Sequence, residues 1–324
     1  MKRFKVVVTD YEYETLRWEK EQLDVVDAEL IPCQCKTEDE LIASACEADA
    51  LLVQYACVTR LVIESLQRCK VIVRYGIGVD SIDLEAAAEY GIPVVNVPDY
   101  GLEEVADHTM ALLMACGRKL LNMDQTVKQG TWNYKLTKPL YRFKGKKLGL
   151  IAFGNIARLV AKRAMAFGIE VQVFDPYLSE QMAREYGVEM VDFSTLIKSS
   201  DYISVHCPAN ASTHHMFNRE VFQKMKPTAV FINTARGVLV DQEALAEALQ
   251  NQLIAAAGID VSEQEPLTAD NRLLTLDNII ITPHAAWYTE ESQQNLQTKA
   301  GEEVARVISG KDPIHVVNPE YRKG

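Results

Sequence analysis

Three short segments in the second half of the chain carry side chains that could bind and protonate a small carboxylic acid. The segments are INTARG (232–237), DVSEQEPL (260–267) and TPHAAWYTEES (282–292). Each follows an apolar run typical of a buried strand, and residues just past the carboxyl ends of parallel strands gather at one ligand crevice. Arg236, Glu265 and His284 could therefore converge, with arginine as a carboxylate clamp and histidine as a proton donor. Each also has an ordinary alternative: a surface ion pair, a solvated loop carboxylate or a buried histidine.

The elements that would position these residues are strands alternating with helices. Ten apolar runs have the composition of strands: KVVV (5–8), ALLV (50–53), KVIVR (70–74), PVVNV (93–97), KLGLIAF (147–153), EVQVFD (170–175), YISVH (202–206), AVFINT (229–234), AAAGID (255–260) and NIIIT (278–282). Runs that are apolar at every position are typical of strands covered on both faces, and the intervening helices supply the crossovers of a parallel sheet. The sequence therefore predicts a doubly wound α/β fold.

One predicted strand runs into a helix through KKLGLIAFGNIARLVAKRA (146–164), which fits the dinucleotide-binding turn G-x-G-x-x-G/A except at its first glycine. Ala152 fills that position, where a turn with positive φ would favour glycine. Gly154 allows pyrophosphate to approach the backbone, and Ala157 is a tolerated third residue. Asp175 ends the next strand, where its carboxylate can accept both ribose hydroxyls and repel a 2′-phosphate. We therefore predict that NAD binds in preference to NADP.

Length, charge and composition limit the number of domains and the classes of function that the chain can have. A chain of 324 residues predicts about two domains. The net charge of −11, without a dense basic run, argues against a nucleic-acid ligand. No apolar stretch approaches the roughly 20 residues that cross a bilayer, and MKRFKVVVTD predicts a first strand rather than a signal peptide. Seven cysteines, an odd number, predict reduced thiols and a cytoplasmic protein.

A metal site is the alternative for one cluster. His206, Cys207, His214 and His215 are residue types that bind zinc, but the chain has no C-x-x-C pair and only one cysteine lies near these histidines. We therefore predict no metal, and expect His214 and His215 to cap or pack beside the cofactor domain.

Taken together, the motifs resemble the D-isomer-specific 2-hydroxyacid dehydrogenases over nearly the whole chain. Besides the three segments and the turn, the resemblance includes RYGIGVDSIDL (74–84), VPDYGLEEVADHTMALL (97–113), VFDPYLS (173–179) and NTARGVLVDQEAL (233–245). Two further motifs, NASTHHMFN (210–218) and PHAAWY (283–288), look most like the branch of C-terminal binding proteins and 3-phosphoglycerate dehydrogenases. The chain ends soon after a final helix near Gly310, so the resemblance implies no regulatory C-terminal domain and no control by serine.

The resemblance implies an NAD-dependent oxidoreductase that moves hydride between NAD(H) and a small D-2-hydroxy acid or 2-keto acid. Arg236, Glu265 and His284 would be catalytic, with Glu265 orienting the imidazole and favouring its charged form. The fold would pair a Rossmann-type nucleotide domain, residues 101–289, with a flavodoxin-like substrate domain, residues 1–100 and 290–324. The segment from 101 to about Arg142 would be the hinge, a long helix followed by an aromatic loop.

The resemblance also assigns contacts. Those to NAD would come from Thr109, Gly154, Asn155, Ile156, Asp175, Cys207, Pro208, Thr213, Thr234, Ala235, Arg236, Asp260, His284, Ala286 and Trp287. Those to substrate would come from Tyr55, Tyr75, Gly76, Ile77, Arg236 and His284, with backbone N–H groups of the Tyr75 to Gly78 loop facing the substrate carboxylate. We expect NAD to bind despite Ala152, which would affect affinity more than function.

Three further expectations concern assembly and substrate. The resemblance implies a homodimer, built through Glu103 to Leu121 and the aromatic run TWNYKL (131–136). Tyr55, Ala56 and Trp287 would present apolar surface to the substrate tail, with only Arg60 and Arg74 as candidates for a phosphate clamp, so unphosphorylated keto acids are predicted. The alternatives are an NAD(H)-sensing dimeric scaffold, as in C-terminal binding proteins, and a 3-phosphoglycerate dehydrogenase without its regulatory domain.

Overall fold

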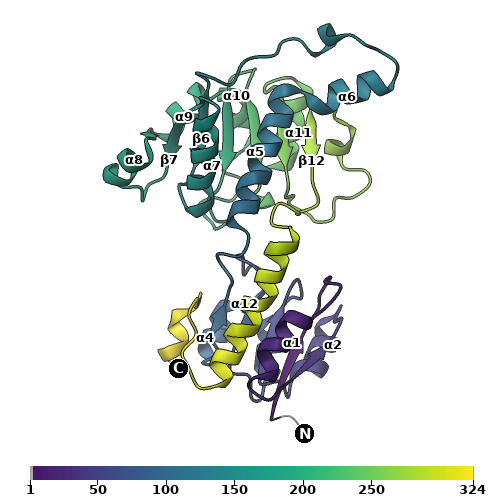
Figure 1. Cartoon of the computed structure of the whole chain (residues 1–324), viewed down its shortest axis with the longest axis vertical. Coiled ribbons are helices and arrows are strands. Elements are labelled where there is room, and N and C mark those ends of the chain that lie inside the picture. The colour runs from purple at the N-terminus through teal and green to yellow at the C-terminus, as the bar shows by residue number, and fades with distance from the viewer. Residues whose placement is uncertain (1–2, 324) are drawn as a thin grey trace. The chain divides into compact units, whose positions relative to one another are not determined.

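The computed structural model describes residues 3–323, which form two compact units, each built on its own parallel sheet (Figure 1). The larger unit runs from Leu102 to Tyr288. The smaller unit combines the chain up to Gly101 with the segment from Thr289 onward.

The larger unit contains a seven-stranded sheet in the order β12-β11-β10-β9-β6-β7-β8. Its strands are β6 (Lys147–Ile151), β7 (Glu170–Phe174), β8 (Glu189–Met190), β9 (Tyr202–Val205), β10 (Val230–Asn233), β11 (Ala256–Ile259) and β12 (Ile279–Ile281). All pairings are parallel. From β6 the chain builds first toward β8 and then, from β9, in the opposite direction. The strand order therefore reverses between β6 and β9, and such a switch point is where doubly wound sheets bind ligands.

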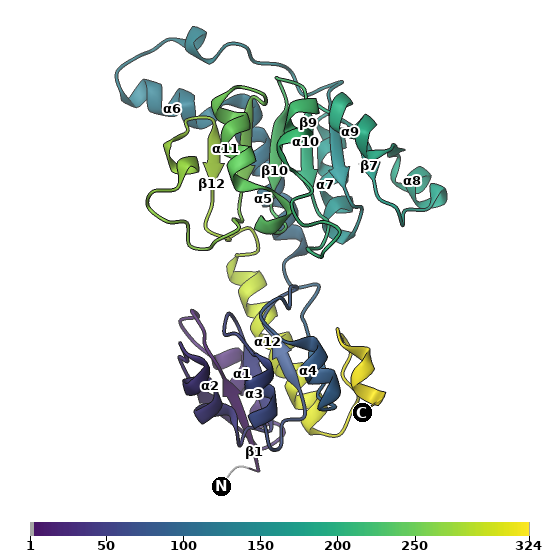
Figure 2. The ribbon, with the colours of Figure 1, turned by 180° about the vertical axis from the view of Figure 1, so that it is seen from behind.

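Helices cover both faces of this sheet. The helices of this unit are α5 (Leu102–Arg118), α6 (Leu120–Lys128), α7 (Asn155–Ala166), α8 (Glu180–Tyr186), α9 (Phe193–Ser199), α10 (Arg219–Lys224) and α11 (Gln242–Gln250), with short 3₁₀ helices η1 (Tyr134–Thr137), η2 (Gly237–Leu239) and η3 (Arg272–Thr275). One core holds Leu113, Leu150 and Val160 beneath α5 and α7. The second core holds Phe217 and Phe231 beneath α10 and α11, on the face seen in Figure 2.

The smaller unit has a five-stranded parallel sheet in the order β2-β1-β3-β4-β5. Its elements are β1 (Phe4–Val8), α1 (Arg17–Asp24), β2 (Ala28–Pro32), α2 (Glu38–Ala45), β3 (Ala50–Val53), α3 (Arg60–Ser65), β4 (Ile72–Arg74), α4 (Leu84–Glu89), β5 (Val94–Val95), α12 (Glu290–Ile308) and η4 (Pro319–Lys323). Helix α12 packs along α1 (Figure 1). Gly301 permits this close approach, because a Cβ there would lie 3.0 Å from the Cα of Glu19.

The predicted fold class, two doubly wound parallel-sheet units, is confirmed. All ten apolar runs contain strands of the two sheets. Two strands were missed. The segment AELIP of β2 mixes polar and apolar residues because this strand lies at the sheet edge, and β8 contains only two residues, both exposed.

Within residues 3–323, none of the helices combines the length and the apolar character that crossing a membrane requires.

Candidate active site

The predicted proton donor and its carboxylate partner are in direct contact. His284 Nδ1 lies 2.7 Å from Glu265 Oε2. The other carboxylate oxygen, Oε1, accepts the backbone N–H of Ser262 at 2.9 Å. Because one oxygen is held by the backbone of its own loop, the second oxygen has a fixed direction toward the imidazole. We refer to Glu265 and His284 as the dyad, and to residues 260–267 as the acid loop.

The electrostatics of the dyad favour a charged carboxylate. Partial burial raises the pKa of Glu265, but the hydrogen bonds from His284 and the Ser262 N–H, with the charges of His284 and Arg236, outweigh this effect. The net pKa of Glu265 is therefore lowered, and the carboxylate stays negative through the neutral pH range. The charge of Arg236 acts on Glu265, so the larger unit brings all three predicted catalytic residues together.

Arg236 is placed by the loop that follows β10. The side chain of Asn233 braces this loop, since its amide donates to the Arg236 carbonyl at 2.9 Å and its oxygen accepts the Ala235 N–H at 3.0 Å. The next residue, Gly237, lies against the acid loop so closely that a Cβ would come within 2.0 Å of the Ser262 carbonyl oxygen. The arginine loop and the acid loop are therefore packed backbone to backbone.

Asp260 holds the loop that presents His284. Its buried carboxylate accepts the N–H groups of Ala285 and Ala286, both at 2.9 Å, and the Thr282 hydroxyl at 2.6 Å. Its carbonyl accepts the His284 N–H at 2.8 Å. His284 itself has φ of 52°, a left-handed conformation that non-glycine residues adopt rarely. The sequence suggested Asp260 only as an NAD contact, whereas the structure shows that its carboxylate secures the histidine loop.

Ala152 adopts an unusual backbone conformation in the nucleotide turn. Ala152 has φ of 68°, so alanine occupies the left-handed position for which glycine is suited. Gly154 is the N-cap of α7 and has open space where a Cβ would stand. Helices α8 to α11 of the same unit are instead capped by polar side chains. The start of α7 therefore fits a pyrophosphate, because its N–H groups face a position that no side chain fills.

The carboxylate of Asp175 lies at the same turn. Its Oδ2 accepts the Phe153 N–H and its Oδ1 accepts the Tyr177 N–H, both at 2.8 Å. Each oxygen keeps capacity for one further hydrogen bond, so the carboxylate fits the two hydroxyls of a ribose. The residues present in this turn therefore fit a dinucleotide.

Other predicted NAD residues lie in α5, in the first turn of α7 and in the loops after β9, β10 and β12. The hydroxyls of Thr109 and Thr234 are 2.8 Å apart, and the Thr213 hydroxyl donates to the Pro208 carbonyl at 2.8 Å. Burial, with the charge of Asp175, raises the pKa of Cys207 to about 11, so this thiol stays protonated. Asn155 and Ile156 form the first turn of α7, and Ala286 and Trp287 follow the histidine.

The histidines of the suggested metal cluster have other partners. Burial lowers the pKa of His206 to about 4, and its Nε2 lies 2.9 Å from the Ser204 hydroxyl. His215 Nε2 contacts Glu263. Across residues 3–323, no group of three or more His, Cys, Asp or Glu side chains has an arrangement that would hold a metal ion.

The predicted substrate residues of the smaller unit follow β3 and β4. Asp10 positions the first of these loops, because its carboxylate accepts the N–H groups of Gln54, Tyr55 and Ala56. The Tyr55 side chain is 53% exposed. Tyr75 is buried instead, with its hydroxyl donating to Glu19 at 2.8 Å.

Within the predicted Tyr75 to Gly78 loop, one backbone N–H group is already engaged. The Tyr75 N–H donates to the Val53 carbonyl at 2.8 Å, within the sheet. The predicted N–H donors to a substrate carboxylate are therefore those of Gly76, Ile77 and Gly78. Gly76 has φ of 127°, which requires glycine, and the Arg74 guanidinium lies where its Cβ would stand.

The fold and the turn together define a dinucleotide-binding protein. Residues 110–286, more than half of the chain, match the family described as D-isomer specific 2-hydroxyacid dehydrogenase, NAD binding domain. The chain is 44% identical over 284 residues to D-3-phosphoglycerate dehydrogenase of Methanocaldococcus jannaschii, covering 87% of this chain and 54% of that protein. It is 41% identical over 314 residues to hydroxypyruvate reductase of Thermotoga maritima, and the match covers 95% of this chain and 99% of that protein. A solved structure of D-lactate dehydrogenase from Aquifex aeolicus, complexed with NAD and lactic acid, is 30% identical in sequence and superposes with a TM-score of 0.87. The match covers 97% of this chain and 99% of that chain.

The chain therefore belongs to the D-isomer-specific 2-hydroxyacid dehydrogenase family. It spans about half the length of the D-3-phosphoglycerate dehydrogenase and nearly all of the hydroxypyruvate reductase. The expected family, its phosphoglycerate dehydrogenase relatives and the NAD cofactor are confirmed. The likeness to C-terminal binding proteins stays a prediction.

The strain at Ala152 gives a prediction about stability. Ala152→Gly should raise the free energy of unfolding by about 0.5–1 kcal/mol, because relief of the left-handed alanine exceeds the cost of a more flexible unfolded chain. Ala157→Gly is the matched control; it lies in α7 and should lower the same quantity by about 1 kcal/mol. Urea denaturation of both variants tests this, and a loss of stability in Ala152→Gly would contradict it.

Proposed function

We propose that the protein is an NAD-dependent oxidoreductase that interconverts a small D-2-hydroxy acid and its 2-keto acid. The observation that supports this most strongly is the dyad. His284 contacts the Glu265 carboxylate, and the positive charge of Arg236 helps to lower the pKa of Glu265. Reduction of a keto group places negative charge on its oxygen, so it requires a proton donor beside a cation. The three side chains supply both.

Each residue has a distinct proposed role. Because His284 Nδ1 is held by Glu265, Nε2 is the nitrogen that gives its proton to the keto oxygen during reduction and takes it back during oxidation. The Arg236 guanidinium holds the substrate carboxylate with two N–H groups, a geometry that lysine lacks. When bound, NADH supplies the hydride that reaches the keto carbon.

The N-terminal turn of α7, with Gly154, Asn155 and Ile156, would hold the pyrophosphate of NAD, and Asp175 would hold the adenosine ribose. Thr109, Cys207, Pro208, Thr213, Thr234, Ala235, Asp260, Ala286 and Trp287 complete the proposed NAD contacts. Tyr55, Gly76 and Ile77 of the smaller unit would complete the substrate contacts.

We propose further that the substrate is unphosphorylated. Of the two arginines considered as a phosphate clamp, Arg60 is bound by Glu89, with its Nη1 2.6 Å from Oε2. The other, Arg74, is confined against Gly76. The Tyr55 ring is exposed and offers aromatic surface to a short substrate tail.

The test is NADH oxidation with glyoxylate, hydroxypyruvate, phosphohydroxypyruvate, pyruvate and bulkier apolar 2-keto acids. We expect turnover of at least one unphosphorylated acid, with NADPH a poorer cofactor because Asp175 repels its 2′-phosphate. A kcat/KM for phosphohydroxypyruvate more than about tenfold above every other acid would contradict the substrate assignment. Equal use of NADH and NADPH would contradict the role of Asp175. NADH-dependent dimerisation without turnover of any acid would favour the NAD(H)-sensing scaffold.

We also propose a homodimer formed through α5 and the segment after it. Helix α6 contains no buried residue, and the following loop exposes Trp132 (89%), Tyr134 (71%) and Leu136 (62%). Exposed apolar surface of this kind is typical of interfaces.

The free thiols and the acidic charge are consistent with a cytoplasmic enzyme that binds no nucleic acid.

Sedimentation velocity tests the dimer. The protein should sediment as a dimer, and Trp132→Asp should shift it toward monomer by placing a charge in the interface. Val25→Asp is the control. Val25 is exposed as well, at 83%, but lies in the smaller unit. A monomer at every concentration, or equal behaviour of the two variants, would show that this surface is not the interface.

A further inference from the structure

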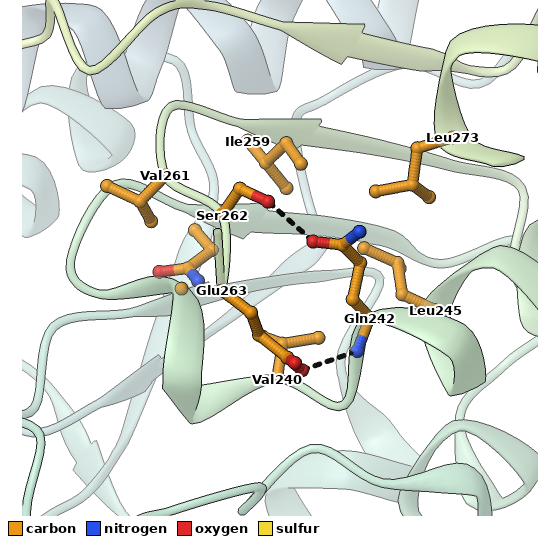
Figure 3. A pocket seen from close by; sticks show the side chains of 10 residues that line it. Val240, Gln242, Leu245, Ile259, Val261, Ser262, Glu263 and Leu273 are labelled. Atoms are coloured by element: carbon orange, nitrogen blue, oxygen red, sulfur yellow. Dashed lines mark hydrogen bonds between the residues drawn. The ribbon is translucent and has the colours of Figure 1, made fainter. Parts of the chain in front are cut away.

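The acid loop is anchored to α11 from two adjacent residues. In Figure 3, dashed lines join the Gln242 side chain to Ser262 and the Gln242 backbone nitrogen to Glu263. The Ser262 hydroxyl donates to Gln242 Oε1 at 2.5 Å, and Glu263 Oε1 accepts the Gln242 backbone N–H at 2.9 Å. The cavity between them has a free volume of about 10 Å³, enough for about one water and too small for a keto acid. These contacts therefore secure the loop and do not form a second ligand site.

Glu263 has one further partner, from a different part of the chain. The same oxygen, Oε1, lies 3.0 Å from His215 Nε2. His215 belongs to residues 206–217, the loop after β9, which we call the cofactor loop because it carries Cys207, Pro208 and Thr213. The His215–Glu263 pair thus ties the acid loop to the cofactor loop.

The backbone around His215 fixes the direction of its ring. His215 has φ of 49°, and its N–H donates to the Val238 carbonyl at 2.9 Å. The Phe217 N–H donates to the Leu239 carbonyl at 3.0 Å. The His214 ring lies against the His215 ring, with centroids 4.0 Å apart. The two backbone hydrogen bonds fix the direction in which the His215 side chain leaves the backbone, and the His214 ring packs against the imidazole that contacts Glu263.

A short run of contacts leads from this pair to the dyad. Glu263 is the neighbour of Ser262, and the Ser262 N–H holds Glu265 Oε1. Glu265 Oε2 in turn contacts His284. A change in the position of Glu263 therefore alters the backbone group that orients the catalytic carboxylate.

We infer that His215 is a positioning residue for the dyad, acting through Glu263 and the Ser262 N–H. This inference rests on the proposed function, since it assigns the dyad a catalytic role. The pair is partly exposed, with side chains 37% and 34% accessible. Exposed ion pairs contribute little to stability, so the main consequence of the contact is the geometry of the acid loop.

The inference is tested with His215→Ala, Glu263→Ala and the double variant. Each should lower kcat for keto acid reduction by about three- to tenfold. The double variant should lose no more than Glu263→Ala alone, because Glu263→Ala already removes the His215 contact together with the bond to the Gln242 N–H. The loss of reduction with rising pH should also move to lower pH, since a displaced Glu265 stabilises protonated His284 less. His215→Gln keeps an N–H donor toward Glu263 and should restore most of the activity.

The matched control is Arg219→Ala. Arg219 Nη2 lies 2.6 Å from Glu247 Oε1, so it also joins the region after the cofactor loop to α11, but its partner belongs to α11 and not to the acid loop. The control should keep wild-type kcat and pH dependence. Equal kcat and equal pH dependence in His215→Ala and Arg219→Ala would overturn the inference.

A second readout separates this inference from the proposed function. Amide hydrogen exchange at Ser262 should accelerate in His215→Ala and stay unchanged in Arg219→Ala, whether or not a substrate is found. If the wild-type protein turns over no keto acid, the proposed function fails, and exchange alone decides whether His215 positions the loop. Unchanged exchange in His215→Ala would overturn it.

Discussion

The hydrogen bond between Glu265 and His284 is the interaction on which the candidate active site depends. It joins the loop after β11 to the loop after β12, two adjacent strands in register through Ala257 and Ile279. Each side of the bond is held by a backbone contact: the Ser262 N–H fixes the carboxylate, and Asp260 gathers the N–H groups that follow the histidine. The sheet therefore brings the two loops together, and short-range hydrogen bonds fix the position of the carboxylate relative to the imidazole.

Ala152 and His284, like His215, adopt a left-handed backbone without being glycine. Ala152 opens the nucleotide turn, and its N–H donates to the Phe174 carbonyl at 2.9 Å. His284 turns the chain so that its ring meets Glu265 while its N–H is held by Asp260. Such conformations cost free energy and persist where neighbouring contacts enforce them, which is common at functional sites. At His284 the left-handed conformation brings the imidazole to Glu265. At position 152 glycine could adopt the same conformation without strain.

Much of this organisation could be predicted from the sequence because the signals were local or periodic. Buried parallel strands are apolar at every position, so their runs stand out, and polar residues at their carboxyl ends mark the ligand side of the sheet. Arg236, Glu265 and His284 were found in this way. The edge strand β2 and the two-residue β8 gave no such signal. Neither the bracing roles of Asn233 and Ser262 nor the link from His215 to Glu263 was predicted, because each joins loops whose approach depends on tertiary packing.

The most direct test of the central claim is the pH dependence of keto acid reduction by the wild-type protein and by Glu265→Gln. Glutamine preserves the shape of the side chain and removes the negative charge that favours protonated His284. The loss of reduction with rising pH should therefore occur at lower pH in Glu265→Gln than in the wild-type protein. Superimposable profiles would contradict the claim, because they would show that the carboxylate does not govern the proton on His284.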